Sequence, residues 1–514
     1  RPGADGRFRL IPDGPTVAIP VESFFLDPAF RGTLQQQVRR LVVDGILSGR
    51  LRPGERMPST RRLAEHLGIS RITVTIAYTD LVANDYLAAR GRSGYFVSEA
   101  APTPTGPLPP PRAAASHVDW SRRLARRFAA QPAITPPPDW RQYPYPFIYG
   151  QVDPRLFDHQ NWRLCAVQAL GQKDFEALTS DTYERDDPVL IEYILRHILP
   201  RRGIHARPEE ILLTLGAQNA LWLAAQLLLD GRRLAVVENP GYPGLARILA
   251  PLGCAIDAVD VDEAGLPPHA IHREPDAVFV TVSHQCPTNA TMPVERRRAL
   301  LARAARHGFV IVEDDYEFEI APFAGPAPSL KAMDTHGSVI YVGSFSKSLF
   351  PGLRLGYLVA PEPFIAEARA LRAMVLRHPP GHVQRTAAHF LSLGHYDAQV
   401  NRLAQAYRRR RAVMEQAIAE HGLNSEGPVR FGASSAWLRA PDGVDVERLA
   451  EQLRARGVLI EPGGGFFNAD PDAGRSNAPP PYVRLAFSSI GSQRIGEGIA
   501  LIAEELAAIT RTAA

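Results

Sequence analysis

Short runs of β-branched and apolar residues alternate with segments of helical period from about residue 143 to the end of the chain. The runs occupy residues 211–214, 234–237, 277–282, 310–312 and 339–342. They are apolar at nearly every position, which is typical of strands covered on both faces, and such strands separated by helices form a largely parallel sheet. The pattern therefore predicts an α/β fold for the larger part of the chain.

The rest of the 514-residue chain divides by composition into three further parts. Residues 1–24 are rich in Gly and Pro and lack a period, which predicts a disordered tail. Residues 25–98 have helical periods and end in a short alternating segment. Residues 99–142 hold ten prolines and are interpreted as a semi-extended linker with one Arg-rich amphipathic stretch. Residues 143–514 form the predicted α/β body.

Charge is distributed unevenly along the chain. Residues 25–98 contain 11 Arg and 6 acidic residues, residues 99–142 contain 6 and 3, and residues 1–24 contain 3 of each. These segments contribute +5, +3 and 0 to the net charge of +4, which leaves −4 for the body. A basic front and an acidic back predict an anionic partner for the front half only.

Cysteine usage and hydropathy limit the class of protein. Cys165, Cys254 and Cys286 are widely spaced, which argues against a disulfide framework or a thiolate metal site and for a reducing compartment. No apolar run approaches the ~20 residues of a membrane helix, and the first residues lack the apolar stretch of a secretory signal. We therefore expect neither a metal site nor a membrane partner.

The basic front has the capping and turn signals of a winged helix-turn-helix. Thr33, Ser59 and Ser70 are N-cap residues for three successive helices, and residues 86–97 are interpreted as a two-stranded wing. In this plan the third helix enters the major groove, and the second helix and the wing lie near phosphates. The residues expected to contact DNA are Arg61, Ser70, Arg71, Thr73, Thr75, Arg90, Gly91 and Arg92.

The run Met57-Pro-Ser-Thr-Arg-Arg-Leu-Ala-Glu-His-Leu-Gly-Ile-Ser-Arg-Ile-Thr-Val resembles the DNA-binding domain of GntR-type bacterial repressors. The resemblance extends through residues 85–87 and 94–97 and implies binding of double-stranded promoter DNA. Asp85 stands where that family usually has Gly, and Asp tolerates the left-handed backbone of this position. The plainer interpretation is a three-helix packing module with a solvated Arg face.

The strongest chemical signal of the body surrounds one lysine. Only three of the 58 basic residues are Lys, and Lys347 lies in Gly343-Ser-Phe-Ser-Lys-Ser-Leu-Phe-Pro-Gly-Leu-Arg-Leu-Gly-Tyr357, directly after a predicted strand. The amine of Lys can form a Schiff base with an aldehyde, which Arg cannot do. Ser344 and Ser346 supply hydroxyls beside it, and the planar guanidinium of Arg354 can hold a phosphate.

Three further strand ends complete the predicted cofactor site. Asp314, 33 residues before Lys347, can keep a pyridine nitrogen protonated, and Tyr316 can donate to the ring oxygen. Tyr242 lies in a turn and can stack on a flat ring. A strand also leads into a helix whose first amides can bind a phosphate, those of Gly216, Ala217 and Gln218. Together these residues predict a site for pyridoxal 5'-phosphate, whereas each alone has an ordinary structural explanation.

The order and spacing of these residues resemble fold-type I, class I and II aminotransferases over about residues 143–510. The resemblance implies a large and a small subdomain and an Arg484 that binds the carboxylate of an amino-acid ligand; the alternative for Arg484 is a surface salt bridge. Gln151 and Tyr183 fall in segments that line the site in relatives. His284 is either a satisfied core histidine or a ligand contact. Cys286 stands where these enzymes usually have an Asn.

A GntR-like head joined by a long linker to an aminotransferase-like body resembles the MocR subfamily of bacterial transcription regulators, over residues 25–510. The resemblance implies a head-to-tail homodimer and a cytoplasmic, nucleoid-associated protein. It also implies an effector such as GABA, taurine, ectoine-derived amines, alanine-type amino acids or the cofactor itself.

The function expected from the sequence is a DNA-binding regulator that uses covalently bound pyridoxal 5'-phosphate to sense an amine or amino-acid effector through external aldimine formation. The effector displaces Lys347, and Arg484 holds its acidic group. Cys286 favours sensing over rapid turnover, so we expect a regulator rather than an enzyme, with weak transamination left open. Two alternatives remain: an active aminotransferase with a DNA-binding head, and a regulator of vitamin B6 synthesis that senses the cofactor itself.

Overall fold

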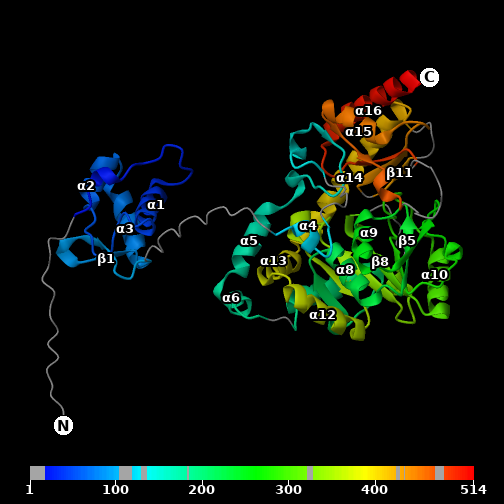
Figure 1. The fold of residues 1–514 in the computed structure, drawn as a ribbon, viewed down its shortest axis with the longest axis horizontal. Helices are drawn as coiled ribbons and strands as arrows, with labels where there is room; N and C mark the ends of the chain where they lie inside the picture. The colour runs from blue at the N-terminus through cyan, green and yellow to red at the C-terminus, as the bar shows by residue number, and fades with distance from the viewer. Residues whose placement is uncertain are drawn as a thin grey trace, which may run out of the picture. The chain divides into compact units, whose positions relative to one another are not determined.

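The computed structural model describes residues 18–102, 118–128, 136–181, 184–320, 328–423, 429–432, 434–468 and 480–513. The chain divides into two compact units, residues 1–127 and 128–514, each with its own hydrophobic core (Figure 1). Within the described ranges no helix is both long enough and apolar enough to cross a bilayer.

The N-terminal unit is a winged helix-turn-helix, as predicted. It consists of α1 (Leu34–Leu47), α2 (Thr60–Leu67) and α3 (Arg71–Ala83), followed by the antiparallel wing strands β1 (Leu87–Ala89) and β2 (Tyr95–Val97). Thr33, Ser59 and Ser70 each accept a hydrogen bond from a backbone N–H in the first turn of their helix, which confirms the three predicted caps. Asp85 has a φ of 60°, so the predicted left-handed backbone is also confirmed.

The core of this unit extends beyond the boundaries predicted from composition. Ile19 and Phe24, expected in a disordered tail, and Ala101, expected in the linker, are buried with Val42 and Val74. A domain this small needs extra apolar cover, and isolated residues in a Gly- and Pro-rich context have no period that would reveal this packing. At the other end of the predicted linker, Trp140 packs in the body. The part of the linker between them contains α4 (Trp120–Arg123).

The body contains a seven-stranded sheet of order β4-β10-β9-β8-β7-β5-β6. Strands β5 to β9 pair in parallel, and β10 is antiparallel to both of its neighbours. The five apolar runs of the sequence are five of these strands, so the predicted largely parallel sheet is confirmed. The strands are β4 (Ile211–Thr214), β5 (Leu234–Asn239), β6 (Ala255–Asp260), β7 (Ala277–Val280), β8 (Val310–Asp314), β9 (Val339–Ser344) and β10 (Gly356–Val359).

Helices cover both faces of this sheet (Figure 1). One face packs against α8 (Ala217–Leu228), α9 (Pro243–Leu249) and α12 (Glu362–Leu376). The other packs against α5 (His159–Ala169), α7 (Pro188–Tyr193), α10 (Val294–His307), α11 (Leu330–Met333) and α13 (Gly381–Ser392), and α6 (Gln172–Leu178) follows α5. The carboxyl ends of the parallel strands meet at one edge, which is where ligands bind in open α/β sheets.

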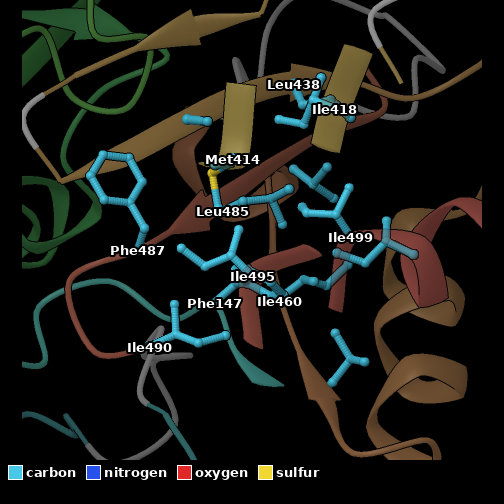
Figure 2. Close-up of a cluster of buried hydrophobic side chains, with 14 of the residues drawn as sticks. Phe147, Met414, Ile418, Leu438, Ile460, Leu485, Phe487, Ile490, Ile495 and Ile499 are labelled. Atoms are coloured by element: carbon cyan, nitrogen blue, oxygen red, sulfur yellow. The ribbon is translucent and has the colours of Figure 1, made fainter. Parts of the chain in front are cut away.

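A smaller subdomain is built on an antiparallel sheet of order β11-β12-β15-β14, with β13 paired in parallel with β3. Its core contains Phe147, Met414, Leu485 and Ile499 (Figure 2). The elements are β3 (Tyr145–Pro146), α14 (His395–Glu420), β11 (Arg430–Phe431), β12 (Ser435–Arg439), α15 (Val446–Ala455), β13 (Val458–Leu459), β14 (Glu461–Pro462), β15 (Tyr482–Ala486) and α16 (Ser492–Ala513).

Candidate functional site

Asp314, the last residue of β8, is a buried carboxylate that lacks a full set of partners. Its side chain is 9% exposed, and Oδ1 has no hydrogen-bond donor among the described residues. Burial, together with Asp315 and Glu238, raises the pKa of Asp314 to about 7, and Lys347 opposes this rise. A buried acceptor without a donor is unfavourable. The protonated ring nitrogen of a pyridine cofactor is a donor that fits this oxygen.

Lys347 follows β9 and lies half-buried in the same body. Its Nζ is 3.8 Å from the centroid of the Tyr149 ring, and a Cβ atom on Gly150 would lie only 3.5 Å from Nζ. Burial lowers the pKa of Lys347 to about 8, while Glu317 opposes this effect and Arg484 adds to it. A Lys with a lowered pKa is neutral more often near pH 7, and the neutral amine is the nucleophile that attacks an aldehyde.

The residues between β4 and α8 have the shape of a phosphate cradle. Gly216 has a φ of 83° at the start of α8, and a Cβ atom on it would lie 3.0 Å from Arg354 Nη2. Arg354 itself donates from Nη2 to the Leu215 carbonyl at 2.9 Å. A guanidinium therefore meets a helix N-terminus at a position where only Gly fits, as an anion site requires. Ala217 and Gln218 form the first turn of that helix.

Tyr242 and Asp314 line one cavity, together with Glu238, Phe279 and Thr281. Tyr242 is the N-cap residue of α9, and burial followed by the Asp314 carboxylate raises its pKa to about 12. The phenol therefore stays protonated, and its flat ring lies beside the carboxylate that would hold a ring nitrogen. This juxtaposition is the one expected of a stacked aromatic cofactor.

Comparison with known proteins agrees with both units. Residues 156–486 match the family "Aminotransferase class I and II", and residues 34–97 match "Bacterial regulatory proteins, gntR family". The chain is 60% identical over 490 residues to the HTH-type transcriptional regulator TauR of Rhodobacter capsulatus, covering 95% of this chain and 100% of that one. It is 30% identical over 462 residues to the probable rhizopine catabolism regulatory protein MocR of Rhizobium meliloti, covering 88% and 90%.

The chain belongs to the MocR subfamily of GntR-type transcription regulators. Its body is similar to the α-aminoadipate aminotransferase LysN of Thermus thermophilus, with a TM-score of 0.67 and 25% identity over 77% of this chain and 100% of that one. It is therefore a transcription regulator with an aminotransferase-like body, and the predicted fold class is confirmed.

Two predicted site residues of this MocR-type body make bonds that the sequence did not predict. The Tyr316 hydroxyl donates to the His284 carbonyl at 3.0 Å, so its one proton is used within the chain rather than held ready for a ring oxygen. Cys286 is 4% exposed, and its Sγ accepts a hydrogen bond from Arg484 at 3.8 Å. Burial raises the pKa of Cys286 to about 12, so it remains a thiol.

Arg484 is neither exposed nor without a partner. Its Nε donates to Glu461 Oε2 at 2.8 Å, and both side chains are buried. Its guanidinium carbon lies 4.0 Å from the Tyr149 centroid and 4.6 Å from that of Phe466. The predicted alternatives were a carboxylate-binding Arg and a surface salt bridge; the structure has a buried salt bridge within the site. The Tyr149 ring contacts both Arg484 and Lys347.

The remaining predicted residues have varied surroundings. Ser344 Oγ accepts from the backbone N–H of Ser346 at 3.2 Å, which shapes the turn before Lys347. The Gln151 carbonyl accepts from Ser488 at 2.6 Å. His284 Nδ1 is buried without a partner in the described part of the chain, and burial lowers the pKa of His284. Tyr183 lies outside the described residues.

Three residues of this site were not predicted from the sequence, namely Tyr149, Glu317 and Glu461. The Tyr149 hydroxyl donates to Glu317 Oε1 at 2.6 Å. The acidic run 313–317 after a strand was the available signal for Glu317. Glu461 carried no local signal, because it meets Arg484 only through the register of β14 against β15.

In the head, Arg61 and Arg90, two of the residues expected near phosphates, are exposed. Arg61 pairs with Glu65 at 2.9 Å, and Arg90 pairs with Glu99 at 3.5 Å, both at the surface. Surface pairs of this kind contribute little to stability, so they hold these guanidinium groups only weakly. Arg71 begins α3 and is also exposed. Of the other predicted contacts, Ser70 caps α3, Thr73 and Thr75 lie within it, Gly91 has a φ of 47°, and the Arg92 side chain lies outside the described residues.

Proposed function

We propose that this regulator binds pyridoxal 5'-phosphate through Lys347 and uses it to sense an amine or amino-acid effector, which changes its affinity for promoter DNA. The observation that carries the proposal is the buried Asp314 oxygen without a donor among the described residues, in the same site as an amine of lowered pKa. In a body with a purely structural role, a buried oxygen of this kind would accept a hydrogen bond from a donor within the chain.

The cofactor, when bound, supplies an aldehyde that condenses with primary amines and a ring that withdraws electrons. Each of the chain's own groups then has one task. Lys347 would bind the aldehyde carbon, Asp314 would pair with the ring nitrogen, and Tyr242 would cover the ring. Arg354 and the amides of residues 216–218 bind the phosphate. Ser344, Ser346, Tyr316 and Cys286 line the remaining wall.

An effector with a primary amine competes with Lys347 for one position, and Arg484 binds the acidic group of effectors that have one. An effector that binds one arrangement of the body more tightly than another shifts their populations. If the two arrangements differ in their affinity for DNA, the effector changes DNA binding. On the DNA, Arg71, Thr73 and Thr75 contact base edges. Arg61, Ser70, Arg90, Gly91 and Arg92 contact the backbone.

We also propose a head-to-tail homodimer that acts at the bacterial nucleoid in the cytoplasm. Large apolar side chains are exposed on two helices of the body: Leu164 and Val167 on α5 are 65% and 63% exposed, and Met374 and Val375 on α12 are 84% and 61% exposed. Exposure of this extent on a monomer favours contact with a second copy. Sedimentation of the purified chain measures this directly.

The test compares Lys347→Ala with Lys173→Ala, an exposed lysine on α6. The wild-type protein and the Lys173 variant are expected to show the visible absorbance of a bound cofactor. Both should also change their affinity for DNA selected from a random pool when GABA, taurine or alanine is added. The Lys347 variant should lose the covalent absorbance and the response. A Lys347→Ala protein that keeps both refutes the proposal.

The second candidate function is an active aminotransferase with a DNA-binding head, and the third is a sensor of the cofactor itself. Cys286 in place of the usual Asn disfavours rapid turnover. Catalytic formation of a keto acid from an amino donor supports the aminotransferase. A change in DNA affinity on addition of pyridoxal phosphate alone, with no amine present, supports the cofactor sensor.

A further inference from the structure

Glu317 is a buried carboxylate at the Lys347 site that the proposed function does not use. It is 1% exposed, and its Oε1 accepts hydrogen bonds from the Tyr149 hydroxyl at 2.6 Å and from the Ser434 hydroxyl. Its other oxygen, Oε2, has no partner within the ranges that the structure describes. A buried carboxylate with one unsatisfied oxygen is costly unless a cation is at hand.

Lys347 is the cation that the geometry offers to Glu317. Both contact Tyr149, Glu317 at the hydroxyl and Lys347 Nζ at the ring, 3.8 Å from its centroid. Of the charged groups that act on Lys347, Glu317 has the largest effect and raises its pKa; Arg484 lowers it, and Glu461 and Cys286 raise it less.

Tyr149 is fixed in place by the small subdomain. Phe147, two residues earlier, is fully buried in the core of that subdomain (Figure 2). Its backbone N–H donates to the Leu459 carbonyl at 2.8 Å, and its carbonyl accepts from Ala486 at 3.1 Å. The Tyr149 ring and the carboxylate bonded to it therefore follow directly from a segment anchored in the small subdomain, and Lys347 Nζ lies against that ring.

Exchange of Lys347 for an effector amine, as in the proposed function, moves charge within this site. With the cofactor bound, one carbon–nitrogen bond would form to the incoming nitrogen and another would break at Nζ, and no oxidant or reductant would be needed. The hydrogens that the incoming ammonium gives up pass to Nζ. A positive charge that entered with the effector is then carried by Lys347, inside the protein, and it needs a counterion there.

We propose that Glu317 and Tyr149 form the receiving site for the released Lys347 ammonium, with the carboxylate as counterion and the ring as a cation–π face. Glu317 is thus a positioning residue that sets how easily an effector displaces Lys347. Without its charge the released ammonium lies beside Arg484 with weaker compensation, and the exchange becomes less favourable.

The first test uses the cofactor-free full chain, so it does not depend on the proposed function. With only three lysines, Lys173, Lys331 and Lys347, competitive acetylation followed by mass spectrometry gives a separate pH titration for each. Glu317→Gln is expected to lower the apparent pKa of Lys347 by about 1 unit, the size of effect of losing one nearby opposite charge, and to leave Lys173 and Lys331 unchanged. Tyr149→Leu, with Glu317 intact, should also lower it and serves if Glu317→Gln does not fold.

The matched control is Glu319→Gln, two residues further along. Glu319 is a half-buried glutamate whose Oε2 is buried and has no partner within the described part of the chain, and burial raises its pKa to about 8, so the substitution removes little charge at pH 7. It should leave the titration of Lys347 unchanged. An equal titration of Lys347 in Glu317→Gln, Glu319→Gln and wild type overturns the inference.

The second test uses the holoprotein and follows the visible spectrum as a small primary amine is added. A fall of the Lys347 pKa from about 8 to about 7 reduces the protonation of the released amine at pH 7, so Glu317→Gln should raise the half-saturating amine concentration about fivefold. Glu317→Asp keeps the carboxylate and should restore part of the loss. Unchanged amine affinity in Glu317→Gln overturns the inference. A wild-type holoprotein that answers no amine at all refutes the proposed function instead, while the acetylation result still decides the role of Glu317.

Discussion

Replacing Asp314 by Asn is expected to stabilise the cofactor-free body at neutral and alkaline pH while weakening its hold on the cofactor. Burial raises the pKa of Asp314 from 3.8 to about 7 in the folded protein. Between these pH values the folded state keeps a proton that the unfolded chain has lost. The free energy of unfolding therefore falls as pH rises from about 4 to about 7, and then levels off.

The size of this effect follows from the difference between the two pKa values. About 3 units, at about 1.4 kcal/mol per unit, give a loss of at most ~4 kcal/mol by pH 8. Asn carries no charge at any of these pH values, so the variant avoids the loss. Relative to wild type, the stability of Asp314→Asn should rise with pH by up to that amount.

Urea unfolding from about pH 4.5 to 8.5 measures this difference. Tryptophan fluorescence is a suitable signal because four of the five Trp residues lie in the body, and the fifth, Trp120, is already exposed in the folded protein. Asp257→Asn, on β6 of the same sheet, is the control and should leave the profile unchanged. With excess pyridoxal phosphate the wild-type protein should instead be more stable than Asp314→Asn, because only the carboxylate pairs with a charged ring nitrogen. A difference between Asp314→Asn and wild type that stays flat across this pH range would refute the reasoning.

Other substitutions address separate parts of the molecule. Gly216→Ala places a Cβ atom 3.0 Å from Arg354 Nη2 at a positive φ, and should raise the dissociation constant for pyridoxal phosphate about tenfold in a spectral titration. Arg71→Ala should lower DNA affinity by about 1–3 kcal/mol in a fluorescence anisotropy assay and relax the base preference at the position that Arg71 contacts, while the absorbance of the body stays unchanged. Cys286→Asn restores the amide that aminotransferases usually have at this position, which would donate to the ring oxygen of a bound cofactor, and should speed keto acid formation from alanine. Phe147→Ala should cost about 3–5 kcal/mol in urea unfolding of the body, because the side chain is fully buried.

The parts of the site that the sequence predicted are those set by short-range pattern. Lys347, Asp314 and Gly216 each lie at or just after the end of an apolar run, and parallel strands bring such ends to one edge of the sheet. The partners that the sequence missed depend on distant packing. Tyr149 reaches Glu317 across 168 residues, and Arg484 reaches Glu461 through strand register. No local period records such a contact.

The buried carboxylates of Asp314 and Glu317 lie on either side of Tyr316 in the sequence, and we expect each to pair with a different positively charged group. Asp314 Oδ1 and Glu317 Oε2 both lack a partner among the residues described, whereas Arg484, the nearby guanidinium, is already paired with Glu461. Arg484 therefore does not neutralise either of them, and two positive partners must come from elsewhere: a ring N–H for Asp314 and the Lys347 ammonium for Glu317. Since the first comes with the cofactor and the second with amine exchange, substitution of Asp314 should act on cofactor retention and substitution of Glu317 on amine affinity. In the double variant, cofactor retention should fall as much as in the Asp314 variant alone, and amine affinity as much as in the Glu317 variant alone. Strong coupling between the two substitutions in either measurement would contradict this division of roles.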